Sequence, residues 1–252
     1  MNSLIFRYFI IALKRNFLLA LVVLLFFGSG RLQGQPTEAY VAFSGGLSIP
    51  LAAYSARQLP EGCFTMPGPE VVISAGIPLW RQFGAKAMAG YYIHPVDVSA
   101  LGYQKLQADP FLSDLTIRSE PYRILAFMGG PFFQLHASRK LRLQGMPVAG
   151  WFSSRSPYQL HKTSYFMPGP AFYEITTSLD RSFAWGLSAL CSYPVATCYE
   201  VGLSLDYLYT KAQFRFRRPD GTERTDPHPI SMFNIHLNLL FKLPDFHNSN
   251  KQ

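Results

Sequence analysis

The stretch Ser231–Leu243, "SMFNIHLNLLFKL", is the clearest strand pattern of this chain. Apolar side chains recur in it at every second position, and these are Phe233, Ile235, Leu237, Leu239, Phe241 and Leu243. Polar residues such as Asn234, His236 and Lys242 lie between them. A period of two is typical of a β-strand with one apolar and one polar face. In a soluble sheet the apolar face packs on a core, whereas in a membrane barrel it faces lipid, so the other segments must decide.

The first 35 residues have the pattern of an export signal. Basic residues Arg7, Lys14 and Arg15 precede the apolar run Phe17–Phe27, and a segment rich in small residues, Gly28–Gln35, follows it. This order is typical of a secretory signal peptide. The apolar run is shorter than the about 20 residues that span a membrane as a helix, which favours a cleaved signal peptide over an uncleaved anchor. We therefore expect residues 1–35 to be removed during export.

The charge balance argues against a nucleic-acid partner. The whole chain has a formal net charge of +8, but residues 1–35 contain four basic and no acidic residues, so the mature chain carries +4. No basic cluster lies beside a nucleic-acid recognition motif. The three cysteines, Cys63, Cys191 and Cys198, have no metal-binding spacing. We expect free thiols, with a disulfide between Cys191 and Cys198 as the alternative.

Eight segments of the mature chain share the two-residue period, and in most of them the odd-numbered residues are the apolar ones. The pattern predicts strands at Tyr40–Leu51, Glu70–Trp80, Gly84–Ile93, Tyr122–Ala137, Leu141–Trp151, Phe183–Tyr193, Tyr199–Tyr209 and Ser231–Leu243. In the fourth segment, Gly129, Gly130 and Pro131 predict a bulge or a kink.

The connections between these segments alternate between short and long. The short ones are "RQF", "SRK" and "PVAT", and the long ones are Ala52–Pro69, Asp97–Pro121, Ser153–Pro170 and Phe216–Ile230. Short turns at one end and long loops at the other are typical of outer-membrane barrels. The sequence therefore predicts that residues 36–244 form an all-β, eight-stranded antiparallel transmembrane barrel with short periplasmic turns and long extracellular loops. Residues 245–252 are expected to be a short tail.

Aromatic residues support this prediction, because membrane barrels carry them at both lipid–water interfaces. Several segments have aromatic side chains near one or both ends of the apolar face. The predicted interface aromatics are Trp151, Phe183, Trp185, Tyr193, Tyr199, Tyr207, Tyr209, Phe233 and Phe241.

These segments resemble the porin-like outer-membrane β-barrel proteins that are common in the Bacteroidetes. The matching segments are "GGLSIPL" (Gly45–Leu51), "AGIPLWRQFGAKAMAGYYIHPVD" (Ala75–Asp97), "GGPFFQL" (Gly129–Leu135), "FAWGLSALCSYP" (Phe183–Pro194) and "VGLSLDYLYTKAQF" (Val201–Phe214), together with the closing strand. The resemblance implies a small eight-stranded barrel and carries over no catalytic residues. Many such barrels end on an aromatic residue, whereas this chain continues through "PDFHNSNKQ".

A barrel of eight strands has an interior just wide enough for side chains, so inward charges should pair with one another. We align the last two strands so that Tyr209 lies opposite Phe233 and Tyr199 opposite Leu243. In this register Glu200 lies opposite Lys242, and Asp206 lies opposite His236. Arg142 and Lys86 are further predicted members of this polar network in the lumen. We expect a satisfied plug of ion pairs, with a proton-sensitive or gated interior as the alternative.

The sequence contains no GxSxG elbow, HExxH pair or phosphate-binding glycine loop. We therefore expect no catalytic residues, no cofactor and no metal site. His94 and His161 are the residues that would matter if the barrel modified lipid. Arg215, Arg217, Arg218 and Arg224 form a basic rim that either contacts lipopolysaccharide phosphates or belongs to a solvated hairpin.

The expected function is a structural or surface-interaction role in the outer membrane, without catalysis. The expected partners are the lipid bilayer and lipopolysaccharide, with another envelope protein as an open alternative. Three rival functions remain at this point: a narrow passive channel, a lipid-modifying enzyme of the outer membrane, and a soluble secreted β-sandwich.

Overall fold

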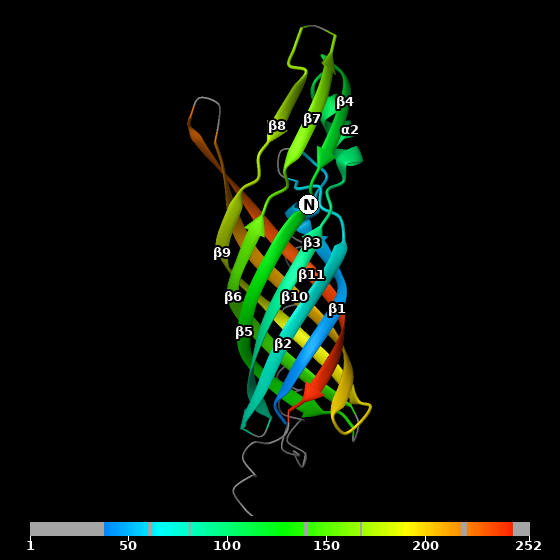
Figure 1. The fold of residues 1–252 in the computed structure, drawn as a ribbon, viewed down its shortest axis with the longest axis vertical. Coiled ribbons are helices and arrows are strands. Elements are labelled where there is room, and N and C mark those ends of the chain that lie inside the picture. Colours follow the sequence, from blue (N-terminus) through cyan, green and yellow to red (C-terminus); the bar gives the residue numbers. More distant parts are fainter. Residues whose placement is uncertain are drawn as a thin grey trace, which may run out of the picture. The chain divides into compact units, whose positions relative to one another are not determined.

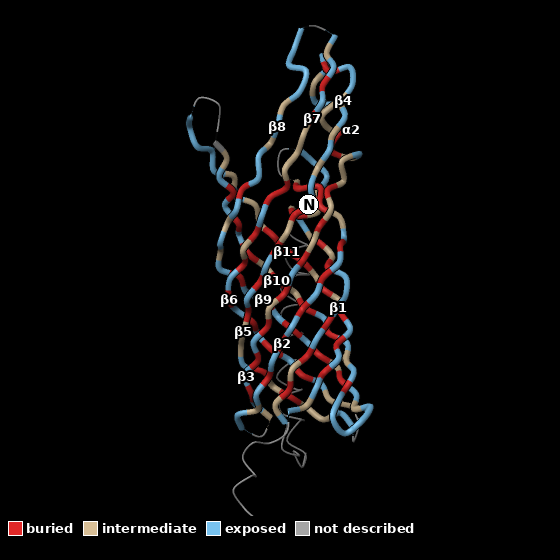
Figure 2. The backbone as a smooth tube through the Cα atoms, viewed as in Figure 1, coloured by how far each residue is buried: buried red, intermediate tan, exposed pale blue. Residues whose placement is uncertain are grey.

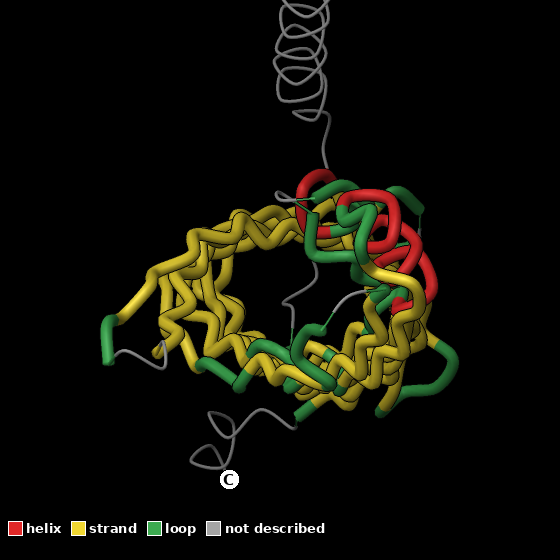
Figure 3. The backbone as a smooth tube through the Cα atoms, turned by 90° about the horizontal axis from the view of Figure 1, so that it is seen from above, coloured by secondary structure: helices red, strands yellow, loops and turns green. Residues whose placement is uncertain are grey.

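The computed structural model describes residues 38–59, 62–80, 82–138, 141–166, 168–217 and 221–243. Within them, eight antiparallel strands close into a barrel in the order β1-β11-β10-β9-β6-β5-β3-β2. Figure 1 shows the barrel from the side, and Figure 3 shows the ring of strands from above. The predicted all-β, eight-stranded antiparallel barrel is thus confirmed. The predicted signal peptide, residues 1–35, and the predicted tail, residues 245–252, lie outside the described residues.

Each barrel strand pairs with its neighbours in sequence or, at the closure, with the opposite end of the chain. The barrel strands are β1 (Tyr40–Leu51), β2 (Gly68–Trp80), β3 (Phe83–His94), β5 (Tyr122–His136), β6 (Arg142–Arg155), β9 (Leu179–Pro194), β10 (Tyr199–Arg217) and β11 (Glu223–Lys242). The closure joins β1 to β11, with Tyr40 opposite Lys242. Both chain ends of the barrel therefore lie beside the short turns, at what we call the turn end. The long connections lie at the other end, the loop end.

The two-residue alternation of the sequence becomes an alternation between the outside and the inside of the barrel (Figure 2). On β11, for example, Leu237 is 70% exposed whereas the next residue, Asn238, is 5% exposed. The same holds on β2, where Ile73 is exposed and Ser74 is buried. The outer wall is apolar and many of the inward side chains are polar, which is the inverse of a soluble sheet.

Of the bulge or kink predicted in β5, the bulge is wrong. The register with β6 is the same on both sides of the segment, because Gly129 pairs with Ala149 and Phe133 with Gly145. No residue is inserted, although the pairing is interrupted between these two pairs. The constant register places Pro131 opposite Pro147, and proline has no N–H to donate to a ladder. Two opposed prolines thus explain the interruption without a bulge.

The long connections at the loop end contain regular structure that the sequence did not predict. An α-helix, α2 (Val98–Ala108), and a strand, β4 (Leu112–Ser119), occupy the link between β3 and β5. Strands β7 (Gln159–Tyr165) and β8 (Phe172–Ile175) occupy the link between β6 and β9. The short strands form a sheet in the order β4-β7-β8 beyond the barrel strands (Figure 1), which we call the loop-end sheet. A short 3₁₀ helix, η1 (Ala52–Tyr54), begins the link between β1 and β2.

Helix α2 escaped prediction because its apolar pattern is weak. Its first turn is capped instead by Asp97, whose carboxylate accepts a hydrogen bond of 3.0 Å from the backbone N–H of Ala100. Leu101 is its main buried side chain. In the described part of the chain, no helix combines the length and the apolarity that crossing a membrane would take.

The predicted long loop at Phe216–Ile230 is also wrong for the most part, because β10 and β11 remain paired as far as Arg217 and Glu223. Strand β1 ends opposite Ser231. The part of β11 before that residue therefore pairs with β10 alone and has a free edge. A free edge tolerates proline, which accounts for Pro227 and Pro229 within this strand.

Candidate functional site

A buried ion cluster lies in the interior at the turn end. Glu200 of β10 is 1% exposed and forms an ion pair with Arg142 of β6. Its Oε1 also lies 3.3 Å from Nζ of Lys242 on β11, and its Oε2 accepts a hydrogen bond of 3.0 Å from Oγ of Ser192. Lys242 additionally lies 3.8 Å from Oε2 of Glu38. The structure therefore brings together three of the residues that the sequence singled out for the lumen.

The register that suggested these partners is wrong by two residues. Tyr199 pairs with Phe241, so Glu200 lies opposite Leu240, and Asp206 lies opposite Asn234. A shift of two residues keeps every side chain on its own face of the sheet. Diagonal neighbours on one face remain within reach of long side chains, which is why Glu200 still meets Lys242.

A second charged cluster lies in the middle of the interior, around His236 of β11. Its Nδ1 lies 2.9 Å from Oε1 of Glu70 on β2, and its Nε2 lies 3.7 Å from Oδ2 of Asp206 on β10. Both ring nitrogens thus face carboxylates of neighbouring strands. Lys86 of β3 is buried and interacts electrostatically with Asp206, but it makes no direct ion pair with a described residue.

Glu70 is the member of this cluster that sequence reasoning missed. Its strand, β2, is not adjacent to β11, because β1 lies between them. Gly46 of β1 is the register partner of both His236 and Glu70. A Cβ atom at Gly46 would lie 2.1 Å from the carbonyl oxygen of Ile235 and 2.5 Å from Cβ of His236. The absence of a side chain at Gly46 therefore lets His236 and Glu70 meet across β1, and the "GG" of the first strand was the available signal.

Four buried polar atoms around this cluster have no hydrogen-bond partner among the described residues. They are Oε2 of Glu70, Oη of Tyr92, Oδ1 of Asp206 and Nδ2 of Asn234. Tyr92 is the register partner of Glu70, and Asn234 is that of Asp206. Groups of this kind usually hold ordered water inside proteins, so the middle of the interior is a polar layer suited to bound water.

A chain of hydrogen bonds connects this layer to the loop end. Tyr54 lies 3.1 Å from Nδ1 of His94, whose Nε2 lies 2.9 Å from Oγ of Ser48. Ser48 in turn donates a hydrogen bond of 2.6 Å to Oδ1 of Asn234. Oγ of Ser48 also lies 3.3 Å from Sδ of Met232, so its one hydrogen has two acceptors within reach, and the role of each His94 nitrogen depends on the tautomer. His94 is completely buried and acts here as a link in the chain, with a partner that the sequence did not indicate.

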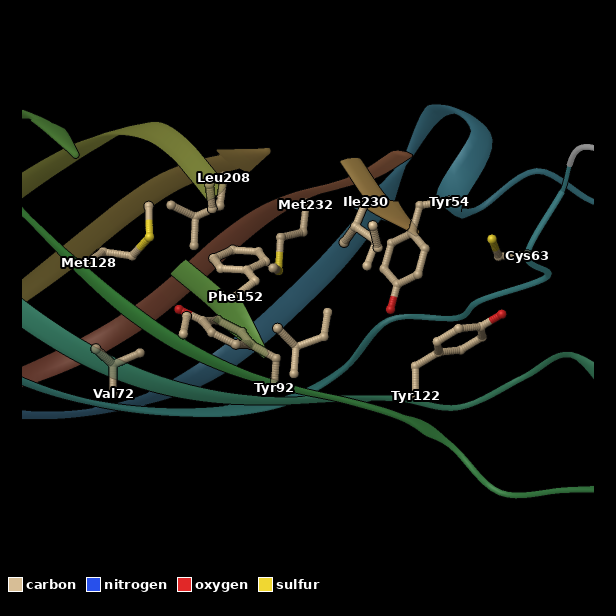
Figure 4. Packing of buried hydrophobic residues seen from close by; sticks show 14 of the residues in the cluster. Tyr54, Cys63, Val72, Tyr92, Tyr122, Met128, Phe152, Leu208, Ile230 and Met232 are labelled. Atoms are coloured by element: carbon tan, nitrogen blue, oxygen red, sulfur yellow. The ribbon is translucent and has the colours of Figure 1, made fainter. Parts of the chain in front are cut away.

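Large apolar side chains fill the interior between this layer and the loop end (Figure 4). Tyr92, Phe152, Leu208 and Met232 come from four different strands, and each is completely buried. Tyr54 of η1 packs edge-to-face on Tyr122, with ring centroids 5.6 Å apart. The interior is thus divided into a charged layer at the turn end, a polar middle and an apolar layer towards the loops.

The loop-end sheet has a polar centre of its own at His161. The ring of His161 stacks on Tyr173 with centroids 4.6 Å apart, and Nζ of Lys105 donates a hydrogen bond of 2.8 Å to Oη of Tyr173. Burial and the positive charge of Lys105 lower the pKa of His161 to about 4. His161 is therefore a neutral, fully buried packing residue at neutral pH.

A cavity of about 200 Å³ lies at the loop end, with Cys63, Lys105 and His228 in its lining. Sγ of Cys63 lies 3.4 Å from Nδ1 of His228. Burial raises the pKa of the Cys63 thiol to about 11, so the thiol is protonated at neutral pH and is a poor nucleophile. All three cysteines are free thiols. Across the described ranges, no group of three or more His, Cys, Asp or Glu side chains is arranged to hold a metal ion.

The predicted interface aromatics lie on the outer wall in two groups. One group is at the turn end, where Tyr199 is the register partner of Phe241 and Tyr193 lies on the adjoining strand. The other is towards the loop end. There, Trp151 pairs with Phe183, Trp185 with Tyr209, and Phe233 with Tyr207. Trp151 and Phe183 are at least 60% exposed.

Comparison with known proteins gives likenesses of structure only. No protein-family model matches the chain, and no curated protein matches it. Among solved structures, Neisserial surface protein A matches with 10% identity and a TM-score of 0.42, covering 82% of this chain and 98% of that one. Ail, the attachment invasion locus protein of Yersinia pestis, matches with 10% identity and a TM-score of 0.40, covering 81% and 100%. A major outer membrane protein of Thermus thermophilus matches with 8% identity and a TM-score of 0.44, covering 81% and 99%. Likenesses this distant assign no function to the chain.

Proposed function

We propose that the chain is an integral outer-membrane barrel. The observation that carries this proposal is the inverted distribution of side chains, with apolar residues such as Leu237 and Trp151 exposed outside and polar residues such as Glu200 and Asn238 buried inside. Such a wall is costly in water but suits lipid, and closure of the barrel leaves no unpaired strand edge in the hydrocarbon. The two groups of outward aromatics support two lipid–water interfaces.

We also propose how the barrel is oriented in the membrane and how the chain is exported to it. The turn end faces the periplasm and the loop end faces the outside, because short periplasmic turns and long outer loops are the rule for such barrels. Residues 1–35 direct export and are then removed, in keeping with their sequence pattern. The sequence segments quoted above further support a place among the porin-like barrels of the Bacteroidetes.

The role we propose is structural or interactive, without catalysis. The loop-end sheet and the β10–β11 hairpin extend beyond the barrel and offer surface for contact. Large side chains such as Tyr103, Phe111, Phe166 and Phe172 are more than half exposed there, which is typical of contact sites on proteins. The partners are the bilayer, lipopolysaccharide and, as an alternative, another envelope protein.

Fractionation and gel mobility test the membrane proposal directly. The full chain should sediment with the outer membrane and migrate faster before boiling than after it, because a closed barrel resists detergent. A soluble periplasmic product without heat-modifiable mobility would overturn the proposal in favour of a secreted β-sandwich.

A narrow passive channel is the second candidate. It is favoured by the polar middle layer, where four buried atoms have no partner among the described residues. It is opposed by the apolar layer above, where Phe152 and Met232 are completely buried. Conductance across planar bilayers separates the two candidates. A lipid-modifying enzyme has less support, because His94 and His161 are both completely buried; unchanged lipid A species in cells with and without the protein would exclude it.

A further inference from the structure

Three arginines lie on consecutive strands of the outer wall, near the loop end. Arg123 of β5 and Arg155 of β6 are register partners. Arg155 pairs on its other side with Leu179 of β9, so Arg181 lies on the diagonal from it, two residues further along that strand. Directly opposed residues on one face have Cβ atoms about 5 Å apart, and diagonal ones are within reach of long side chains. Arg123 is half-buried, and Arg155 and Arg181 are exposed.

The three arginines have no direct acidic partner among the described residues. None of the three arginines takes part in an ion pair or a hydrogen bond with a described residue. No acidic residue stands at the odd-numbered, outward positions of β5, β6 or β9, and the one acid on these strands, Asp180, is at an inward position. Like charges directly opposite each other destabilise a sheet. An anion from outside the chain, placed between the side chains, would relieve this repulsion.

The position of the arginines defines where that anion must be. On β6, Arg155 lies four residues beyond Trp151, which is about 13 Å along a strand. On β9, Arg181 lies two residues beyond Phe183, which is about 7 Å. Outward aromatic side chains such as these lie at the level of lipid headgroups. The arginines thus lie at, or just outside, the headgroup layer on the loop-end side.

We propose that Arg123, Arg155 and Arg181 bind the phosphate of a lipid headgroup in the leaflet at the loop end. This inference rests on the proposed membrane insertion and deepens it by naming a lipid site. Arginine suits the role because its planar guanidinium forms paired hydrogen bonds with phosphate and carries a permanent charge. Three guanidinium groups from three strands surround one anion without needing an acidic neighbour. The acyl chains of the same lipid would lie on the apolar wall below, beside Trp151 and Phe183.

The test compares a triple variant with a matched control in the full chain. Arg123→Gln, Arg155→Gln and Arg181→Gln together remove the cluster. The control carries Arg57→Gln, Arg118→Gln and Lys162→Gln, which removes the same charge from residues outside β5, β6 and β9. Each purified protein is titrated in detergent with a diphosphorylated lipid A analogue, with the same lipid lacking phosphate, and with inorganic phosphate. Bound lipid is counted by native mass spectrometry.

The expected result is that the unmodified chain and the control prefer the phosphorylated lipid. The triple variant should lose about tenfold or more in affinity for it, since each arginine near an anionic membrane surface contributes strongly. Inorganic phosphate should compete weakly, because it lacks the acyl chains. Equal affinity of the triple variant and the control, or no preference for phosphate in the unmodified chain, would overturn the inference. Heat-modifiable mobility of all three proteins is measured in parallel, so a failure of the barrel itself is recognised separately.

Discussion

Glu200 is the residue on which the turn end of the interior depends. One carboxylate, almost completely buried, faces Arg142 and Lys242 and also accepts a hydrogen bond from Ser192. Taking charged groups out of water is expensive unless they are paired. Glu200 alone pairs with two cations, and Glu38, 3.8 Å from Lys242, supplies the second negative charge. The ion pairs of this layer therefore depend on one another. Removal of the Glu200 carboxylate should therefore weaken the contacts of Arg142, Lys242 and Ser192.

Glu200→Gln should therefore lower the free energy of unfolding by about 3 kcal/mol, because Arg142 loses its acidic partner and Lys242 keeps only the more distant Glu38. Urea-induced unfolding of the refolded barrel in micelles or liposomes measures this. Glu120→Gln is the matched control, since Glu120 lies outside the strands. Equal stability of the two variants would mean that the buried ion pairs contribute nothing.

Gly46 is the second decisive residue, because it lets His236 and Glu70 meet across β1. Gly46→Ala should destabilise the barrel by about 1–3 kcal/mol, as expected for overpacking, since the new Cβ would lie 2.1 Å from a backbone oxygen. Gly45→Ala is the control on the adjacent position, where the nearest atom to a new Cβ is 4.0 Å away. The same urea titration compares the two variants, and a neutral Gly46→Ala would contradict the proposed packing.

The sequence predicted which residues face the interior, but it did not predict all of their contacts. The alternation of odd and even positions alone identified Glu200, Lys242, Asp206 and His236 as inward-facing. The face of a side chain does not change when the register shifts by two residues. The alternation could not identify Glu70 as a partner of His236. That contact depends on which strands are adjacent in the closed barrel and on the missing side chain of Gly46 between them.

At the scale of elements, the barrel strands were predictable and the loop-end elements were not. Lipid-facing strands need a regular alternation, and the sequence shows it. Helix α2 depends on a cap by Asp97 and on local packing, and the extended hairpin of β10 and β11 contains prolines that normally argue against a strand. A free edge, visible only once β1 ends opposite Ser231, removes that objection.

The loop-end sheet should open more readily as the pH falls. His161 is neutral in the folded sheet, with a pKa of about 4, whereas an exposed histidine has a pKa of about 6.5. The open form therefore binds more protons between these values, so the stability of the sheet is complete above about pH 6.5 and is lost progressively towards about pH 4. Amide hydrogen-exchange protection factors of β4 and β7 should fall between about pH 7 and about pH 5.

His161→Phe is the variant that isolates this effect. It keeps an aromatic ring to stack on Tyr173 but cannot take up a proton. Protection factors in β4 and β7 of this variant should change little between the two pH values, and amides in the middle of β11 serve as an internal reference in both proteins. A pH dependence of the same size in the variant would assign the opening to another group.

At the scale of the whole molecule, the chain is a barrel with an apolar outer wall and a filled interior. An apolar layer, which includes Tyr92 and Phe152, lies between the polar middle and the loop end, and a charged layer around Glu200 lies at the turn end. The sequence predicted a narrow polar interior because eight strands leave little room. It did not predict the apolar layer, since even-numbered Phe152, Leu208 and Met232 look like exceptions to the pattern until the strands close around them.

Conductance across a planar bilayer tests the filled interior most directly. The full chain, shown by heat-modifiable mobility to be folded in the same liposomes, is fused into the bilayer and recorded at several voltages. A filled interior predicts a flat baseline, while a variant with Tyr92→Ala and Phe152→Ala, which empties part of the apolar layer, tests whether an opened interior conducts. Steady single-channel steps from the unmodified chain, abolished by a reagent that blocks the lumen, would contradict the filled interior and establish a channel.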